Sequence, residues 1–450
     1  MPVSTAWSRM GRASKKQAPD RDESSSSVRP TTNLLHPHGV EHTRLNRALK
    51  RLDYSHVILA SGFLVLFFAS GARFAFGLVL KPMSEDLDIS RSVLSSAFTV
   101  FMVVSALAMP VVGRLIDRYS IRLTMGGGAV LSALAIALMG RVQSQWELFA
   151  VYGVLLGLGT AAVSVAPVSV LMSRWFPTRR GLAASAAISG NGIGQLVIIT
   201  LMASFLATLG WRTSYLILGA AYAAVVVPIA VAVVRSRPPA APQAQTPSSA
   251  EPSSAMGDVL RSRSFWLLAA LFAACGAQDF FMATHIVAFA QDQGVSDLLA
   301  GNILAFMGLF GLAGVLLAGF LADAHGASKP TLLCFVLRIG IFAYIPLFQD
   351  TPSIVAVALI YGFTFTMTAP LTVVFAGNIF GTERLGTVSG LINMVHQVAG
   401  GLGAVLGAAV FDWRDSYDIA FVLMLGLAIV GAAATALLSE RRLAGDSKLK

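Results

Sequence analysis

A short charged loop that occurs twice constrains the fold of this chain most strongly. The segment Gly113–Arg122 lies between two long apolar runs, and Gly319–Gly326 lies between two others, 206 positions later. A second pair of loops, Arg174–Gly181 and Ile379–Gly386, repeats at an offset of 205 positions. Internal repeats of this kind are common in membrane transporters. The sequence therefore predicts two halves that are built to one plan.

Apolar residues dominate the composition of the chain. Hydrophobic residues make up 55% of the 450 positions and charged residues only 12%, with a mean hydropathy of +0.71. Soluble domains carry about 25% charged residues. Apolar stretches of about 20 residues recur along the chain, which is the length of a membrane-spanning helix, whereas a membrane β-barrel shows alternating segments of about 10 residues. The composition therefore predicts an all-α membrane protein and excludes a water-soluble fold.

We predict twelve transmembrane helices in two pseudo-symmetric six-helix bundles. The polar, serine-rich segment 1–52 is expected to be a disordered tail, and the proline-rich segment 235–263 to be a linker. The linker joins an N-terminal bundle, 53–234, to a C-terminal bundle, 264–438, and a short tail follows at 439–450. The predicted spans are 55–79, 92–112, 123–140, 147–172, 182–208, 212–234, 264–290, 299–321, 330–348, 353–377, 387–411 and 416–438.

Lysine and arginine gather in alternate loops, which predicts the orientation in the membrane. Most of the 33 basic residues fall on one side, so we expect both termini, the repeated loops and the linker in the cytoplasm. The net charge of +10 then reflects topology, and no nucleic-acid partner is expected. Cys275 and Cys334 lie within apolar spans, which argues against a structural disulfide and against a metal site. We expect no cofactor, because the chain lacks a nucleotide-binding glycine loop with its lysine.

The loop Gly113–Arg122 resembles the signature loop of the major facilitator superfamily, which reads Gly-x-Leu-x-Asp-Arg-x-Gly-Arg followed by Arg or Lys. Here Ser120 replaces the second glycine, and Ile121 replaces the first residue of the basic pair. The second copy of the loop keeps Gly319, Leu321, Asp323 and Gly326. The resemblance covers about residues 55–440 and implies the two-bundle fold of that superfamily.

Other segments resemble one branch of this superfamily, the bacterial members of the monocarboxylate transporter and oxalate:formate antiporter group. The resemblance implies transport of small organic anions across the cytoplasmic membrane. One departure concerns the eighth span, where carboxylate carriers of the family commonly have an arginine and this chain has no basic residue. The segments that carry the resemblance are Ala72–Gly77 with Lys81–Met83, Arg174–Phe176 with Arg179–Gly181, and Gly276–Gln278 with Thr284 and His285.

The repeated loops also predict a gate at the cytoplasmic ends of the helices. An aspartate at one helix end, close to arginines of another loop, can hold two helices together and release them when that side opens. We predict this role for Asp117, Arg118, Arg180 and Asp323. The alternative is that these charges only anchor the topology.

Three spans contain a charged residue away from their ends, namely Arg73, Asp279 and Arg338. A charge near the bilayer centre costs about 2.5–3.5 kcal/mol on insertion scales, so it needs a partner or a water-filled cavity. We predict that Arg73, about 28 Å along its helix, recruits an anion near the outer mouth, unless it only reaches for the headgroups. Asp279 is predicted to exchange a proton, with a structural ion pair as the alternative, and Arg338 is interpreted as structural.

Uncharged polar residues complete the predicted binding site. Gln278 and His285 are seven residues apart and share one helix face, and Asn393, His396 and Gln397 form a stripe at positions i, i+3 and i+4. The alternative for such residues is a polar contact between helices. The predicted substrate-binding residues are Arg73, Asn191, Gln195, Gln278, His285, Asn393, His396 and Gln397, and the predicted proton-coupling residues are Asp279, His285 and His396.

We therefore predict a monomeric secondary transporter that moves a small organic anion, with a monocarboxylate as the expected substrate and a proton as the candidate coupling ion. Its bundles would rock about a central site that faces each side of the bilayer in turn. One alternative is efflux of a hydrophobic drug or metabolite, and another is a membrane sensor. A membrane enzyme is disfavoured, because the spans hold no nucleophile–base set and no metal-ligand cluster.

Overall fold

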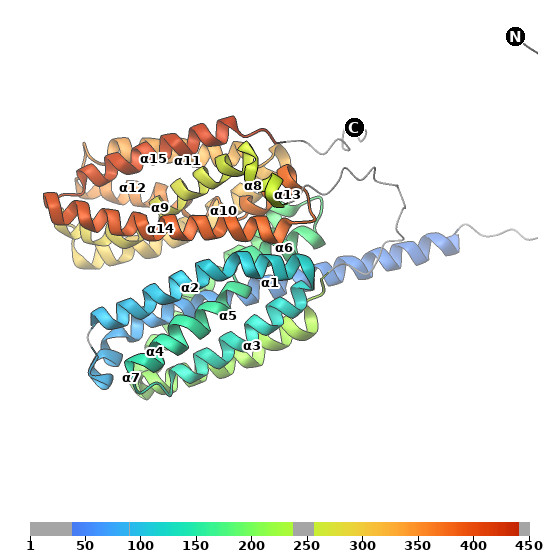
Figure 1. Cartoon of the computed structure of the whole chain (residues 1–450), viewed down its shortest axis with the longest axis horizontal. Helices are drawn as coiled ribbons and strands as arrows, with labels where there is room; N and C mark the ends of the chain where they lie inside the picture. Colours follow the sequence, from blue (N-terminus) through green and yellow to red (C-terminus); the bar gives the residue numbers. More distant parts are fainter. Residues whose placement is uncertain (1–37, 90, 237–255, 441–450) are drawn as a thin grey trace, which may run out of the picture. The chain divides into compact units, whose positions relative to one another are not determined.

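The computed structural model describes residues 38–89, 91–236 and 256–440. The chain divides into two units, Met1–Leu49 and Lys50–Lys450, and the fold below is that of the second unit. Its regular elements in the described residues are helices that run side by side (Figure 1). Helix α1 begins at His38, inside the segment 1–52 that the sequence predicts as a tail. The predictions for residues 1–37, 441–450 and most of the linker concern positions outside the described residues.

The N-terminal half contains the first six predicted spans. Its fourth span is made of several short helices, because the backbone changes between α-helical and π-helical geometry along it. Helix α7 contains the fifth and sixth spans and is kinked at Gly210. At this kink φ is 74°, a conformation that glycine adopts at little steric cost. The elements are α1 (His38–Leu87), α2 (Arg91–Arg118), α3 (Ile121–Met139), α4 (Gln145–Leu148), the π-helix η1 (Phe149–Leu156), α5 (Gly157–Ala162), α6 (Val165–Trp175), α7 (Arg180–Pro228) and the π-helix η2 (Ile229–Val233).

The C-terminal half repeats this order after a short helix that ends the linker. Here too the fourth span is broken. The elements are α8 (Met256–Arg261), α9 (Arg263–Asp292), α10 (Asp297–His325), α11 (Ser328–Tyr344), α12 (Thr351–Phe365), α13 (Leu371–Phe380), α14 (Leu385–Arg414) and α15 (Asp418–Leu437).

Ten helices of the described residues are long and apolar enough to cross a bilayer, and each matches one predicted span. The ninth predicted span is the 17-residue helix α11, and the tenth is divided into α12 and α13. The division falls just before Pro370, because proline lacks a backbone N–H and disfavours a helical conformation in the preceding residue. In the first half, α5 and α6 likewise separate just before Pro167. The predicted twelve-span plan therefore corresponds to the observed helices.

The two halves meet along two helix pairs. Helix α2 packs against α14, and α7 packs against α10. Within the halves, α9 packs against both α14 and α15, and α3 packs against α7. The loop that follows α2 and the loop that precedes α14 meet at one end of the molecule, which we call the latch end.

Candidate functional site

Asp117, at the C-terminal end of α2, binds the first turn of α14 across the boundary between the halves. Its Oδ1 accepts a hydrogen bond from the Gly386 N–H at 2.9 Å, and its Oδ2 accepts bonds from the N–H and Oγ1–H of Thr387 at 2.7 and 2.8 Å. The Arg174 guanidinium lies 3.7 Å from Oδ1. A carboxylate at a helix N-terminus satisfies free N–H groups and interacts favourably with the helix dipole.

Asp323, at the end of α10, makes the reciprocal contact with the first turn of α7. Its Oδ1 accepts from the Gly181 N–H at 2.7 Å, and its Oδ2 accepts from the Leu182 N–H at 2.8 Å. Each half therefore caps a helix of the other half with an aspartate from its repeated loop. We call these two contacts the latches. Both are formed in this structure, so the latch end is closed.

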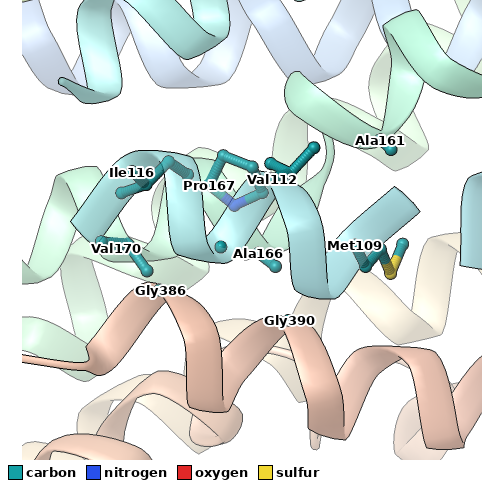
Figure 2. A pocket seen from close by; sticks show the side chains of 10 residues that line it. Met109, Val112, Ile116, Ala161, Ala166, Pro167, Val170, Gly386 and Gly390 are labelled. Carbon is teal, nitrogen blue, oxygen red and sulfur yellow. The ribbon is translucent and has the colours of Figure 1, made fainter. Parts of the chain in front are cut away.

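Paired glycines allow the latches to close. A Cβ atom on Gly386 would lie 2.6 Å from the carbonyl oxygen of Gly113, and a Cβ on Gly181 would lie 2.6 Å from that of Gly319. Separations this short are not found for real Cβ atoms, so larger residues would force the backbones apart. Figure 2 shows the crossing of α2 and α14, where Gly386 and Gly390 face a small apolar pocket that Val112 and Ile116 also line.

The two predicted gating arginines lie outside these hydrogen bonds. Arg180 donates from Nε to the carbonyl oxygen of Pro177 in its own loop, at 3.1 Å. The Arg118 guanidinium lies 5.6 Å from the centre of the Tyr119 ring. The aspartates therefore pair mainly with backbone N–H groups, which have no signature in the sequence.

A buried polar cluster surrounds Asp279 near the middle of the 30-residue helix α9. The two carboxylate oxygens have different partners. Oδ1 accepts from Nη2 of Arg338 at 2.7 Å and from the Tyr361 hydroxyl at 2.9 Å. Oδ2 accepts from the His396 ring at 3.3 Å and from the Cys275 thiol at 3.4 Å. We call these five residues, Cys275, Asp279, Arg338, Tyr361 and His396, the Asp279 cluster.

Arg338 is completely buried, and its other donors are used as well. Nε donates to Oγ1 of Thr364 at 3.2 Å, Nη2 also donates to the Thr364 carbonyl at 3.0 Å, and Nη1 donates to Oε1 of Gln278 at 3.1 Å. The guanidinium also lies over the Tyr361 ring, 4.8 Å from its centre. Arg338 is thus held as the counter-charge of Asp279. Tyr361, Thr364 and Cys275 were not among the predicted site residues, because a single polar group on an apolar helix has no periodic signal.

The two membrane histidines have different environments. The Nε2 of His285 lies 2.8 Å from the carbonyl oxygen of Ala404, and its Nδ1 lies 3.2 Å from the Tyr417 hydroxyl. A carbonyl only accepts, which assigns the proton to Nε2 and makes Nδ1 the acceptor for Tyr417. Burial raises the pKa of the Tyr417 hydroxyl, which sits just outside α15. His285 therefore ties α9 to α14 and α15, whereas the His396 side chain is 22% exposed and is the accessible member of the Asp279 cluster.

Arg73 on α1 is a cation with no carboxylate partner among the described residues. Its Nη2 lies 3.0 Å from the sulfur of Met102, and its guanidinium lies 5.5 and 5.9 Å from the ring centres of Phe74 and Phe101. Its Nε atom is buried without a hydrogen-bond partner. A charge in such a site is unfavourable until an anion pairs with it.

The remaining predicted site residues are not part of the Asp279 cluster. Asn191 and Gln195 are half-buried on α7, and Gln397 is half-buried on α14. Asn393 donates to the carbonyl oxygen of Ser389 in its own helix at 2.8 Å. Gln278 joins the cluster through Arg338, and its Nε2 donates to the Met424 carbonyl at 2.8 Å.

Three donor atoms of metal-binding type converge in the cluster. Ligand atoms of Cys275, Asp279 and His396 lie within 4.8 Å of one another, the one such trio in the described part of the chain. The guanidinium of Arg338 already neutralises the Asp279 carboxylate, and its positive charge disfavours a second cation there. The arrangement is therefore better suited to holding a proton than to holding a metal ion.

The chain is similar in sequence to known membrane transporters. The model of the Major Facilitator Superfamily matches residues 62–404 and 274–449. The MFS-type transporter YcxA of Bacillus subtilis (strain 168) is 28% identical over 370 residues, which cover 80% of this chain and 89% of the relative. Monocarboxylate transporter 11 of Homo sapiens is 26% identical, covering 84% and 81%, and the oxalate:formate antiporter of Oxalobacter formigenes is 24% identical, covering 79% and 85%.

Solved structures agree with the fold. The transporter FucP in an outward conformation superposes with a TM-score of 0.69 at 16% identity, covering 86% of this chain and 100% of that one. The proton:xylose symporter XylE gives 0.68 at 13% identity, covering 87% and 97%. The predicted resemblance and the predicted two-bundle helical fold are therefore confirmed.

Proposed function

The chain belongs to the major facilitator superfamily and is a multi-pass membrane transport protein, not an enzyme, and on this premise we propose that it carries a small organic anion together with a proton. A monocarboxylate is the expected substrate. The names of two relatives, a monocarboxylate transporter and an oxalate:formate antiporter, support this substrate class. The observation that carries the proposal is the half-buried side chain of Arg73, whose buried Nε has no hydrogen-bond partner and whose guanidinium has no carboxylate partner in the described residues.

Arg73 is a better anion site than Arg338, because Arg73 is half-buried and Arg338 is completely buried. Every donor of Arg338 is directed at protein atoms, so a substrate carboxylate would have to displace Asp279 to reach it. The Arg73 side chain has only the sulfur of Met102 and two aromatic rings beside it. A carboxylate that binds there replaces weak contacts with charge-assisted hydrogen bonds.

Neutralising Arg73 is expected to abolish most transport without unfolding the protein. In Arg73→Gln, no carboxylate is left unpaired, so the melting temperature should stay near that of the wild type. Loss of one charge-assisted bond, about 1.5–3 kcal/mol, corresponds to roughly 10- to 150-fold weaker carboxylate uptake. Uptake of radiolabelled small carboxylates into proteoliposomes measures this.

The matched control is Arg414→Gln, which removes an exposed arginine at the end of α14. Surface substitutions change the stability of a protein by roughly ±0.5 kcal/mol, so this variant should change uptake less than twofold. Equal uptake by Arg73→Gln and wild-type protein would refute an anion site at Arg73. Extrusion of hydrophobic dyes, with no carboxylate transported, would instead favour the efflux alternative.

The Asp279 cluster supports proton coupling. Arg338 and Tyr361 hold Oδ1 of Asp279 in place, so Oδ2 is left to the Cys275 thiol and to the partly exposed ring of His396. An imidazole is the side chain whose charge changes most readily near neutral pH. Protonation of His396 would strengthen its bond to Asp279 and add a positive charge at mid-membrane, which favours binding of an anion.

Replacing the two histidines should separate coupling from structure. In wild-type proteoliposomes, we expect uptake to rise as the external pH is lowered from 8 to 6. His396→Gln should lose this dependence, while His285→Gln should keep it and instead lower the melting temperature, because two interhelical hydrogen bonds are weakened. Proton flux recorded with an internal pH dye distinguishes the two variants. The same pH dependence in both would contradict the assignment of the proton to His396.

We also propose that the protein lies in the cytoplasmic membrane with both termini in the cytoplasm, which follows from the positions of lysine and arginine. The latch end is then cytoplasmic, and the closed latches correspond to a state in which the site is reached from outside. Alternation between closed and open latches would carry the anion across.

A further inference from the structure

A methionine lies against the guanidinium of Arg73. Helix α2 places the sulfur of Met102 at 3.0 Å from Nη2 of Arg73, which belongs to α1. A thioether sulfur is a weak hydrogen-bond acceptor, and the Nε of the same arginine is buried with no partner. The guanidinium therefore has weaker partners than it can bind, and a stronger acceptor in the place of the sulfur would be held more tightly.

Met102 is also accessible to small solutes. Most methionines of the described residues are buried, whereas the side chains of Met102, Met256 and Met394 are partly exposed. Of these three, Met102 alone accepts a hydrogen bond from an arginine in the part of the chain that the structure describes. A methionine side chain has three rotatable bonds, so its sulfur can turn while the backbone of the helix stays in place.

The reaction open to an accessible thioether is oxidation to a sulfoxide. Hydrogen peroxide transfers one oxygen atom to the sulfur. The O–O bond breaks, an S–O bond forms, and both hydrogens of the peroxide leave with its second oxygen as water. The sulfur is oxidised by two electrons and the peroxide is reduced by the same two. The product is a polar side chain with a strong acceptor oxygen, which the thioether lacks.

We propose that Met102 is a peroxide-sensitive modification site that controls binding at Arg73. Once the sulfoxide has formed, rotation of the side chain brings its oxygen to Nη2 of Arg73, which donates a charge-assisted hydrogen bond to it. This oxygen then takes the place that a substrate carboxylate needs, so oxidation inhibits by competition. The inference rests on the proposed function, in which Arg73 binds the anion, and it adds a means of regulating that site.

The test measures uptake of a radiolabelled small carboxylate into proteoliposomes with the full-length protein, before and after hydrogen peroxide. We expect peroxide to raise the KM of the wild type at least about fivefold, because a charge-assisted bond then competes with the substrate. Peptide mass spectrometry should find one added oxygen at Met102. Met102→Leu should keep the KM that it has before treatment, whereas Met256→Leu should stay as sensitive as the wild type. Equal sensitivity of Met102→Leu and wild type would overturn the proposal.

Further measurements separate this site from other oxidative damage. Dithiothreitol reverses the early oxidation of cysteine and leaves a sulfoxide intact, so recovery of uptake with dithiothreitol would assign the effect to Cys275 or Cys334 and overturn the proposal. Met102→Gln, which carries an acceptor oxygen near the position of the sulfoxide oxygen, should have a higher KM than Met102→Leu without any peroxide. A melting temperature that falls together with uptake would show general damage and would also overturn the proposal.

Arg73→Gln distinguishes a failure of this inference from a failure of the proposed function. If Arg73→Gln loses uptake while peroxide leaves the KM of the wild type unchanged, the modification site is wrong and the anion site stands. If Arg73→Gln transports like the wild type, the anion site is wrong, and competition by Met102 is refuted with it.

Discussion

Asp279→Asn is expected to destabilise the folded protein by about 3–5 kcal/mol, because it leaves the completely buried guanidinium of Arg338 without its counter-charge. The loss should appear as a lower melting temperature and a smaller monodisperse fraction on size-exclusion chromatography. Transport should be lost as well, since the His396 ring loses its charged partner at Oδ2.

An exposed ion pair on the protein surface provides the control for this prediction. The ion pair between Arg212 and Asp86 has the same N–O distance, 2.7 Å, but its two side chains are 37% and 47% exposed. Exposed pairs contribute about 0–1 kcal/mol, so Asp86→Asn should change the melting temperature little. Equally small losses of melting temperature in Asp279→Asn and Asp86→Asn would show that burial does not increase the contribution of the Asp279–Arg338 pair to stability.

A double variant separates stability from transport. Replacing a buried ion pair by apolar residues of similar volume is often neutral or stabilising. Asp279→Leu/Arg338→Met should therefore recover most of the melting temperature that Asp279→Asn loses. Transport should remain absent, because the carboxylate that accepts from His396 is missing. Recovery of transport in the double variant would exclude Asp279 from the coupling mechanism.

Gly113→Leu is expected to hold the latch end open and to reduce transport at least about tenfold. Its side chain would meet the backbone of Gly386 and Thr387 on α14, which cannot move aside while the latch is closed. Overpacking of this kind costs about 1–3 kcal/mol, and roughly 1.4 kcal/mol is a tenfold change in an equilibrium. The penalty falls on the closed state alone, since the open state separates α2 from α14.

Cysteine labelling reports on the latch directly. Ile116 is 2% exposed and lines the pocket at the crossing of α2 and α14 (Figure 2), so a cysteine placed there reacts with maleimide only when the latch opens. Ile116→Cys should react faster in the Gly113→Leu background than in Gly127→Leu, where an added Cβ atom would meet nothing within 4 Å. Equal labelling rates would show that the glycine contact does not control this end.

The sequence could identify the latch residues but not their partners. Asp117 and Asp323 stand out because they recur at the same place in two copies of one loop. Their main partners are backbone N–H groups at the starts of α14 and α7, and every residue except proline has such a group. Only the folded chain shows which helix start faces which loop.

Only some members of the Asp279 cluster could be predicted from the sequence. A charged side chain in an apolar span needs a partner, so Asp279 and Arg338 could have been paired from the sequence as an acid and a base within the spans. The hydroxyls of Tyr361 and Thr364 could not be found this way, because hydroxyl groups occur in many spans. His285 and His396 were both predicted to couple protons, and only the folded structure shows that His285 contacts Tyr417 and Ala404 while His396 contacts Asp279.

The sequence by itself determined the number and order of the spans and the repeat of the two halves. Span length, hydropathy and proline geometry are local properties, and a bilayer enforces them because unpaired backbone groups are not tolerated in lipid. The tertiary structure alone decided which polar groups meet. Residues such as Asp279, Arg338 and His396 lie on three different helices, and their contact depends on helix rotation and packing, which no local pattern encodes.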